Sequence, residues 1–263
     1  MKVIYSASYS IIVTGYKGYI ARELIKKVGA SDWKETNLDF ITEPCTIIHL
    51  AAKADIKDGS VNLLRNNTIA DLCVIDSCVK YGHRLVYAST NNVYPLKVNC
   101  RQGENHIPND SYSLSKFVGE KLLKLLPASQ YIILRLADVF GYGQKYGNFF
   151  KALEHAISKG QQFNLTDRGD KLRSYIYIDE LVDILIYSCL IDKYDGGIYN
   201  ICHKEPLSLF DISLALLGDV LANNESSYDY RTMEQSCFFD YKYQFTMKEA
   251  LARYLFEIKN RED

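Results

Sequence analysis

Short apolar runs alternate along the chain with longer stretches in which apolar residues recur at helical spacing. Residues 11–15 (IIVTG) are apolar and β-branched, which predicts a strand buried on both faces. Residues 19–28 carry apolar side chains at helical spacing and are followed by Gly29, a common helix terminator. A strand, a glycine turn and a helix in this order predict the start of a βαβ unit. Residues 2–5 could add a small strand ahead of it.

The alternation continues to Gly141 and is looser beyond it, with a further helix and a short strand before residue 201. About 15 residues separate the first helix from the next strand, too few for a further strand and a crossover helix. The second βα unit is therefore expected to be abbreviated. Two later helices are expected after Ser208 and at the capping-box pattern Thr246–Glu249. The remaining predictions are strands at residues 46–51, 84–89, 131–137 and 197–201 and helices at residues 69–82, 111–126 and 179–190.

This order of elements predicts an α/β fold, a Rossmann-type doubly wound parallel sheet with a small C-terminal substrate-binding cap. We expect residues 1–140 to form the dinucleotide-binding unit, with residues 174–200 returning to it. Residues 141–173 and 201–263 should form the cap. Ligands are expected at the carboxyl ends of the strands, in a cleft between the two parts.

Composition and charge narrow the choice of function. The 263 residues include 31 basic and 32 acidic side chains, so a net charge of −1 gives no global attraction for nucleic acid. The apolar runs fall short of the roughly 18 residues that cross a bilayer, and the N-terminus lacks the apolar core of a secretion signal. The seven cysteines form no CxxC pair, so neither a metal site nor a disulfide is expected. These features favour a cytoplasmic protein.

Gly15 and Gly18 lie between the predicted first strand and helix, with Ala21 where a third glycine could stand. Residues without Cβ allow a tight turn and let backbone N–H groups approach a pyrophosphate at the helix N-terminus. An ordinary tight βα turn would have the same spacing. Asp39, about 20 residues further on, could accept a hydrogen bond from an adenosine ribose, face the adenine, or simply end a turn. Lys17 could favour the additional phosphate of NADP or be a surface lysine.

Thr90, Tyr112 and Lys116 carry the strongest chemical signal. Tyr112 and Lys116 are expected on one face of a helix that begins after Asp110 or Ser111, four residues apart. Lowering a tyrosine pKa from about 10 to about 7 requires roughly 4 kcal/mol, which one ammonium about 4 Å away can supply at an effective dielectric near 20. Thr90 ends a predicted strand and can hydrogen-bond the same substrate oxygen. A surface Tyr–Lys pair on an amphipathic helix is the alternative.

The sequence resembles the extended short-chain dehydrogenase/reductases, and more narrowly the NAD-dependent epimerase/dehydratase group that acts on nucleotide-activated sugars. The motifs that carry this resemblance are VTGYKGYIA, HLAA, Asn66-Asn67, YASTNNVYP, YSLSK, LRLADVFGYG and RSYIYIDELVDIL. The resemblance implies that Tyr112 is the catalytic acid or base, with Lys116 and Thr90 as its catalytic partners. It implies substrate contacts for Asn92, Asp138 and Arg173, and contacts with NAD or NADP for Gly15, Gly18, Tyr19, Ile20, Asp39, Phe40, Leu50, Ala51, Ala52, Asn67, Tyr112 and Lys116. Packing roles for the alanines and a surface ion pair for Arg173 remain alternatives.

Two departures from the family pattern bear on the reaction. Asn91 and Asn92 follow Thr90 where sugar dehydratases of this group carry Asp-Glu, and amides cannot perform that acid–base work. Asp138 stands where many relatives have Asn, and an unpaired carboxylate there would repel a diphosphate. The sequence therefore predicts an epimerase or a 4-ketoreductase that acts on a nucleotide sugar. The resemblance also implies a homodimer formed through the helices at about 69–81 and 111–126. A catalytically inactive dinucleotide-binding regulatory or scaffold protein is the alternative.

Overall fold

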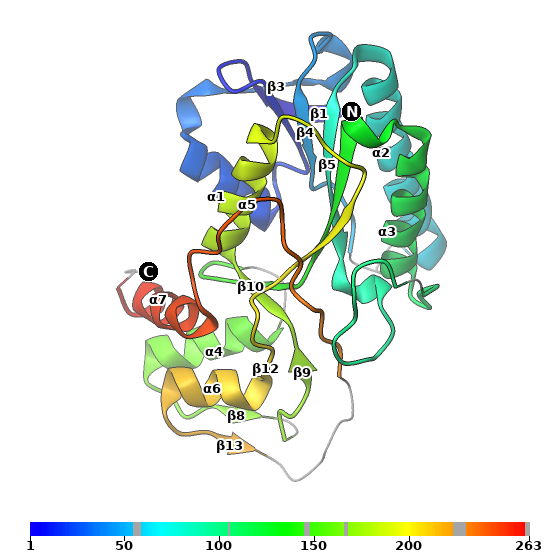
Figure 1. The fold of residues 1–263 in the computed structure, drawn as a ribbon. Coiled ribbons are helices and arrows are strands. Elements are labelled where there is room, and N and C mark those ends of the chain that lie inside the picture. The colour runs from blue at the N-terminus through cyan, green and yellow to red at the C-terminus, as the bar shows by residue number, and fades with distance from the viewer. Residues whose placement is uncertain (55–58, 105, 145–147, 166–167, 223–229, 261–263) are drawn as a thin grey trace.

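The computed structural model describes residues 1–54, 59–104, 106–144, 148–165, 168–222 and 230–260. A seven-stranded sheet in the order β11-β6-β5-β4-β2-β1-β3 forms the larger part (Figure 1). Its strands are β1 (Lys2–Ser6), β2 (Ile11–Thr14), β3 (Trp33–Asn37), β4 (Thr46–His49), β5 (Arg84–Thr90), β6 (Tyr131–Leu136) and β11 (Ile198–Ile201). No helix within the described residues is both long enough and apolar enough to span a membrane.

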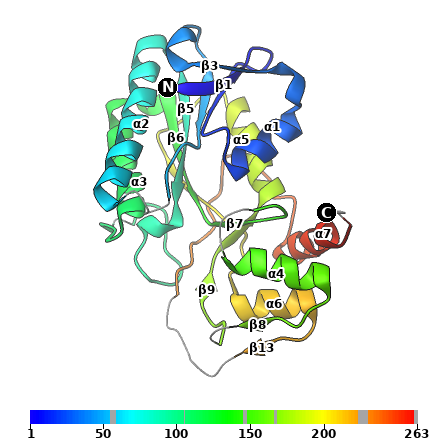
Figure 2. The same ribbon diagram turned by 180° about the vertical axis from the view of Figure 1, so that it is seen from behind.

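Helices cover both faces of this sheet (Figures 1 and 2). α1 (Tyr19–Val28) and α5 (Ile178–Leu190) lie on one face, and α2 (Ser60–Tyr81) and α3 (Ser111–Leu122) on the other. Neighbouring residues of a strand point to opposite faces, so Val13 packs in the core beneath α1 and α5 whereas Ile12 packs beneath α2. Burial on both faces explains why the strands are continuous apolar runs.

The N-terminus adds the one antiparallel strand of the seven-stranded sheet. β1 forms a hairpin with β2, in which Ile4 lies opposite Val13, and it pairs on its other side with β3. β3 consequently runs parallel to β2 but is separated from it by β1. The predicted small strand at residues 2–5 is confirmed, whereas β3 was not predicted. The expected abbreviation is also confirmed, because β3 leads to β4 through the short 3-10 turn η2 (Leu38–Phe40) without a crossover helix.

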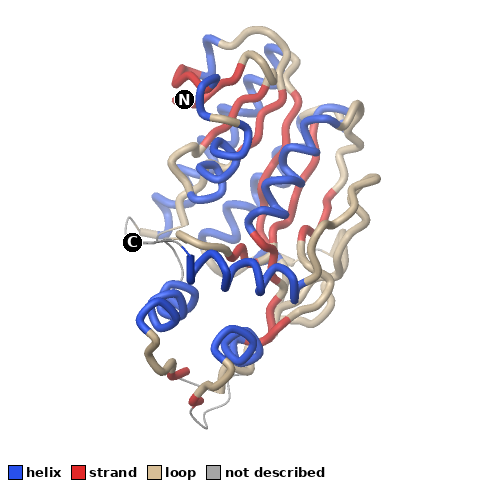
Figure 3. The backbone as a smooth tube through the Cα atoms, turned by 90° about the vertical axis from the view of Figure 1, so that its left-hand side faces the viewer, coloured by secondary structure: helices blue, strands red, loops and turns tan. Residues whose placement is uncertain are grey.

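The smaller part lies beyond the carboxyl ends of the strands (Figures 1 and 3). Its helices are α4 (Asn148–Lys159), α6 (Leu209–Leu217) and α7 (Met247–Asn260). Short strand pairs accompany them: β8 (Asn164–Leu165) with β13 (Leu221–Ala222), β9 (Leu172–Arg173) with β12 (Leu207–Ser208), and β7 (Asp138–Phe140) with β10 (Tyr175–Tyr177). Both expected helix caps are present, since Ser208 caps α6 through Asp211, and Thr246 and Glu249 exchange hydrogen bonds at the start of α7.

The chain returns from this smaller part to the sheet before it reaches α7. Ser236 donates a hydrogen bond to Gln102 and accepts one from the backbone N–H of Asn200 in β11. Tyr241 donates to the buried carboxylate of Glu180 in α5, at 2.7 Å. The segment between the smaller part and α7 is therefore tied to the sheet and to the helix α5 that covers it.

Candidate active site

A cleft of about 1410 Å³ opens where β2, β5 and β6 end, and residues of the smaller part close its other side. The volume exceeds the roughly 300–1,000 Å³ typical of a site for one small ligand, so a dinucleotide and a second ligand can share it. Most of the residues singled out in the sequence line this cleft. They are Gly15, Gly18, Tyr19, Ile20, Leu50, Ala52, Thr90, Asn92, Tyr112, Lys116 and Asp138.

The glycine turn after β2 lies directly against the loop after β4. Gly15 has a φ of +66°, and a Cβ there would stand 2.7 Å from the backbone of Ala51. Ala51 supports the turn from beneath, since its N–H donates to Thr14 Oγ1 at 3.1 Å, and it does not line the cleft. The expected contact of Ala51 with the dinucleotide stays a prediction.

The N-terminus of α1 faces the cleft, and no side chain of the described residues caps it. Gly18 occupies the N-cap position, no side chain caps the helix, and its first turn contains no acidic residue. The first backbone N–H groups of a helix carry partial positive charge and need an acceptor. Gly18, Tyr19 and Ile20 thus fit a pyrophosphate, which is the group that a dinucleotide would present here.

Tyr112 and Lys116 enter the cleft from the first turns of α3. Asp110 caps this helix by accepting a hydrogen bond from the N–H of Ser113 at 2.8 Å. Thr90 approaches from the last position of β5, where its hydroxyl accepts from the N–H of Asn92 at 3.2 Å. The three residues expected to be catalytic therefore line one cleft although they come from different elements.

The phenol of Tyr112 is not acidic in this structure. Burial, together with the nearby carboxylate of Asp110, raises the pKa of Tyr112 to about 12. Deprotonation near pH 7 therefore requires roughly 7 kcal/mol of preferential stabilisation of the phenolate, instead of the roughly 4 kcal/mol that applies to an unperturbed tyrosine. A single ammonium about 4 Å away supplies about 4 kcal/mol at an effective dielectric near 20. Since the pKa is raised to about 12 with Lys116 in place, the lysine alone does not make the phenol acidic, and a further positive charge is needed.

Lys116 is 3% exposed, and its ammonium lies 4.4 Å from the centroid of the Tyr87 ring. Burial lowers the pKa of Lys116, whereas the carboxylates of Asp71 and Glu120 act in the opposite direction. The face of an aromatic ring attracts a cation, so Tyr87 and the two carboxylates together favour a charged lysine beneath the cleft.

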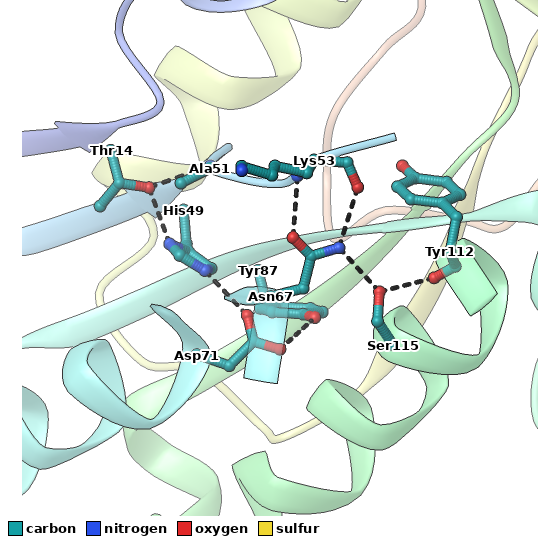
Figure 4. A network of polar contacts seen from close by, with 9 residues as sticks. All are labelled: Thr14, His49, Ala51, Lys53, Asn67, Asp71, Tyr87, Tyr112 and Ser115. Atoms are coloured by element: carbon teal, nitrogen blue, oxygen red, sulfur yellow. Dashed lines mark hydrogen bonds and ion pairs between the residues drawn. The ribbon is translucent and has the colours of Figure 1, made fainter. Parts of the chain in front are cut away.

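A chain of buried polar groups connects the glycine turn with this region (Figure 4). His49 lies between Thr14, 2.7 Å from its Nδ1, and Asp71, 2.9 Å from its Nε2. Asp71 also accepts a hydrogen bond from the hydroxyl of Tyr87 at 3.1 Å. Gly119 of α3 makes room for this contact, because a Cβ there would stand 2.0 Å from the Tyr87 hydroxyl. The network fixes β2, β4, β5 and α2 relative to one another.

Asn67 supports the site from beneath instead of lining the cleft. Its amide exchanges hydrogen bonds with both backbone polar groups of Lys53, at 2.8 and 2.9 Å. It also donates to Ser115 at 2.9 Å, and Ser115 in turn donates to the backbone carbonyl of Tyr112 at 2.7 Å (Figure 4). In this structure Asn67 therefore holds the loop after β4 against the start of α3.

The substrate end of the cleft carries both signs of charge. Asp138 accepts a hydrogen bond from the side chain of Asn91 at 3.3 Å. Asn92 accepts one from the guanidinium of Arg231, which belongs to the returning C-terminal segment. Arg231 also forms a β-bridge with Arg173, so the backbones of these two arginines lie next to each other.

Three further expected residues do not line the cleft. Asp39 and Phe40 lie on η2, where each side chain is 75% exposed. Arg173 lies beyond the rim in β9. The assignments of Asp39 and Phe40 to the adenine and of Arg173 to the substrate stay predictions.

Sequence reasoning also missed residues that the structure brings to the site. Arg231 follows no motif and arrives only because the chain returns from the smaller part. Asp71 could have been found, because Asn67, Asp71, Val74 and Cys78 are spaced as one helical face and all four are buried. Polar residues on a buried helical face indicate a polar network.

Comparison with known proteins agrees with this geometry. Residues 34–202 match the model of the NAD dependent epimerase/dehydratase family. A UDP-glucose 4-epimerase of Vibrio cholerae is 26% identical over 226 residues, which cover 67% of this chain and 65% of that protein. The crystal structure of UDP-N-acetylglucosamine 4-epimerase from Bacillus cereus superposes with a TM-score of 0.81 at 18% identity, covering 95% and 96% of the two chains. The crystal structure of Thermus thermophilus UDP-glucose 4-epimerase in complex with NAD superposes with a TM-score of 0.74 at 18% identity, covering 96% of this chain and 99% of that one. The chain therefore belongs to the NAD-dependent epimerase/dehydratase family.

Proposed function

We propose that this protein is an NAD(P)-dependent epimerase or 4-ketoreductase that acts on a nucleotide-activated sugar, with Tyr112 as its acid/base. One observation carries the proposal: Thr90, Tyr112 and Lys116 line the same cleft as the uncapped N-terminus of α1. A dinucleotide bound there would rest on Gly15, Gly18, Tyr19 and Ile20, and Leu50 and Ala52 would line its path toward Tyr112. A catalytically inactive regulatory protein would not need these three residues beside a dinucleotide site.

Tyr112, Thr90 and Lys116 have separate roles in the proposed reaction. Tyr112 takes the proton of a sugar hydroxyl as the alcohol is oxidised and returns it when the ketone is reduced, a role worth about 10²–10⁴ in rate. Thr90 hydrogen-bonds the same sugar oxygen and fixes its position, while Lys116 stabilises the phenolate by charge. The nicotinamide, when bound, accepts or supplies the hydride. Asn91 and Asn92 offer no carboxyl group for dehydration, so that reaction is not part of the proposal.

The nucleotide sugar would enter from the side of the smaller part. We propose that Asn92, Asp138 and Arg173 contact it, as the family resemblance implies, and that Arg231 joins Arg173 as a second cation for its diphosphate. Arginine suits this role because its planar guanidinium can donate two parallel hydrogen bonds to phosphate oxygens. The division into a dinucleotide-binding unit (1–140 and 174–200) and a cap (141–173 and 201–263) belongs to the same proposal, as does the cytoplasmic location.

We also propose a homodimer through α2 and α3. Val61, Ile69, Leu72 and Val79 follow one side of α2, and each is exposed. Leu125, just beyond the end of α3, is exposed as well. A stripe of exposed apolar side chains along a helix is typical of a surface that pairs with another protein. Light scattering should give the mass of a dimer at micromolar concentration, and Ile69→Asp should shift it toward that of the monomer; a monomeric wild type would contradict the proposal.

The decisive experiment compares Tyr112→Phe with the wild type on a panel of nucleoside diphosphate sugars with NAD⁺, NADP⁺ and their reduced forms. The variant should lose about 100-fold or more in turnover, whereas Tyr9→Phe, at an exposed position, should not. Sugar interconversion without added dinucleotide identifies an epimerase. Stoichiometric loss of NAD(P)H absorbance with a 4-keto sugar identifies a reductase. Unchanged turnover in Tyr112→Phe would contradict the mechanism.

A further inference from the structure

The N-terminal hairpin changes the end of the cleft where a dinucleotide places its adenosine. In a doubly wound dinucleotide-binding sheet, the strand after the first helix pairs directly with the first strand, and an acidic residue at its end accepts from the adenosine ribose. Here β1 occupies that neighbouring position. The strand that follows α1 is β3, which lies one strand further out, a displacement of about 4.8 Å.

The direction of β1 decides which of its residues reaches the cleft. Because β1 runs antiparallel to β2, its beginning lies at the carboxyl edge of the sheet. Lys2, the first residue of β1, lies opposite Asn37, the last residue of β3. The side of the cleft next to Gly15 is thus formed by a lysine, at the place where the general pattern has an acid.

Further basic residues border the same end of the cleft. Lys2, Lys17 and Arg22 all line it beside Gly15 and Gly18. Among the described residues that line the cleft, Asp138 is the acidic one, and it lies at the substrate end beside Asn91. The adenosine end therefore carries a local excess of positive charge although the whole chain is nearly neutral.

Glu35 of β3 is an acidic residue near this end, but other groups occupy its carboxylate. One oxygen accepts from the Lys2 ammonium at 3.0 Å, and the other accepts from the hydroxyl of Tyr16. These two hydrogen bonds and the charge of Lys2 lower the pKa of Glu35. The carboxylate thus holds Lys2 and Tyr16 in place. An acid engaged in this way, one strand away from β2, is poorly placed to accept from a ribose hydroxyl.

We propose that Lys2, Lys17 and Arg22 form a subsite for the 2′-phosphate of NADP(H), so that this protein selects NADP(H) over NAD(H). The subsite rests on the proposed dinucleotide function and adds to it the identity of the cofactor. Its ligand is the phosphate on the adenosine ribose, which Lys2 of the inserted strand and Lys17 of the glycine turn contact together. NADP(H) thus carries a group that matches the basic end of the cleft, and NAD(H) lacks it.

Equilibrium binding of NADPH and NADH to the purified protein tests this without catalysis, by titration calorimetry at low ionic strength. NADPH should bind about tenfold or more tightly than NADH, as expected for one charge-assisted hydrogen bond or more. Adenosine 2′,5′-bisphosphate should bind more tightly than adenosine 5′-monophosphate by a similar factor. The preference should shrink as salt is added, because these cations are partly exposed to solvent.

Four variants assign the effect to residues. Lys2→Ala and Lys17→Ala should each weaken the binding of NADPH several-fold and leave the affinity for NADH within about twofold. Retained NADH binding also shows that the variants are folded. Lys34→Ala, at an exposed position of β3, is the matched control and should change neither constant. Glu35→Gln should preserve or strengthen NADPH binding because it removes the carboxylate that now engages Lys2.

The outcomes separate the two proposals. If NADH binds as tightly as NADPH, or if Glu35→Gln loses NADH binding, then Glu35 contacts the ribose and the 2′-phosphate subsite is wrong while the dinucleotide site stands. If neither dinucleotide binds, the proposed function and the subsite are both wrong. A preference for NADPH that survives Lys2→Ala and Lys17→Ala would contradict the assignment to the inserted strand.

Discussion

The phenol of Tyr112 should become acidic only when a second cation joins Lys116, and this can be measured without a substrate. Burial and Asp110 raise its pKa to about 12 in the ligand-free protein. Ionisation near pH 7 then requires roughly 7 kcal/mol. A unit charge is worth about 4 kcal/mol at a separation of about 4 Å and about 3 kcal/mol at about 6 Å, with an effective dielectric near 20. Because Lys116 is already present in the ligand-free protein, one further cation lowers this pKa by about 2 to 3 units toward neutral pH.

Oxidised and reduced cofactor form a matched pair for this experiment. They differ in the positive charge of the nicotinamide ring, so only the oxidised form should lower the pKa of Tyr112, by about 2 to 3 units. The near-ultraviolet absorbance of phenolate, recorded against pH as the difference between wild type and Tyr112→Phe, isolates this residue from the other 20 tyrosines (21 in all, less Tyr112). The unliganded protein should ionise at Tyr112 only at strongly alkaline pH.

The same titration with Lys116→Met tests the contribution of the lysine. With the ammonium removed, Tyr112 in the complex with oxidised cofactor should titrate about 2 to 3 units higher than in the wild type. Lys121→Met, on the exposed side of the same helix, should leave the titration unchanged. The reasoning fails if oxidised and reduced cofactor give the same curve, or if Tyr112 already ionises near neutral pH in the ligand-free protein.

Three further predictions concern the supporting structure. Gly15→Ala should abolish measurable dinucleotide binding, because its Cβ would clash with backbone 2.7 Å away; Gly29→Ala, which has a positive φ but an open surrounding, should lose roughly 1–2 kcal/mol of stability and retain binding. Arg135→Met should lower the free energy of unfolding in urea by about 3–5 kcal/mol, because it strands the buried carboxylate of Glu120, and adding Glu120→Leu should restore part of the loss. The pKa of His203 is lowered by burial to about 4, so the stability it contributes is present above about pH 6.5 and is lost as the pH falls toward 4. Urea unfolding across that range should show about 3 kcal/mol less pH dependence in His203→Gln, and an equal dependence in both proteins would contradict this origin.

The sequence predicts those elements whose signals are local. α1 begins and ends where the spacing of apolar residues and Gly29 indicate, and Asp110, Ser208 and Thr246 cap the helices that follow them. α2 begins at Ser60 instead of residue 69. Val61, Leu63 and Leu64 lie in its first turns, but the polar run of residues 65–68 separates them from the periodic part of the helix. The helix α4 and the strand β3 were not predicted either.

The residues of the site also fall into those with a local sequence signal and those without one. Residues that belong to compact motifs, such as Gly15, Thr90 and Tyr112, were found in the sequence and line one cleft. Arg231 could not be found, because its place depends on how the chain after residue 230 folds back on β9. Which segments meet across the cleft is decided by long-range packing, and a single sequence without local periodicity at those positions carries no signal for it.

The inserted strand shows why a spacing rule for the ribose acid cannot be applied to this chain. The rule counts residues from the glycine turn and assumes that the strand after α1 pairs with β2. Glu35 and Asp39 both satisfy the count, yet the sheet order places β1 between them and the turn. Glu35 keeps the expected number of residues between itself and the glycine turn, but the inserted strand increases its distance from the turn in space. In the proposed subsite, the group beside the ribose is therefore the residue at the start of β1, which in this chain is Lys2.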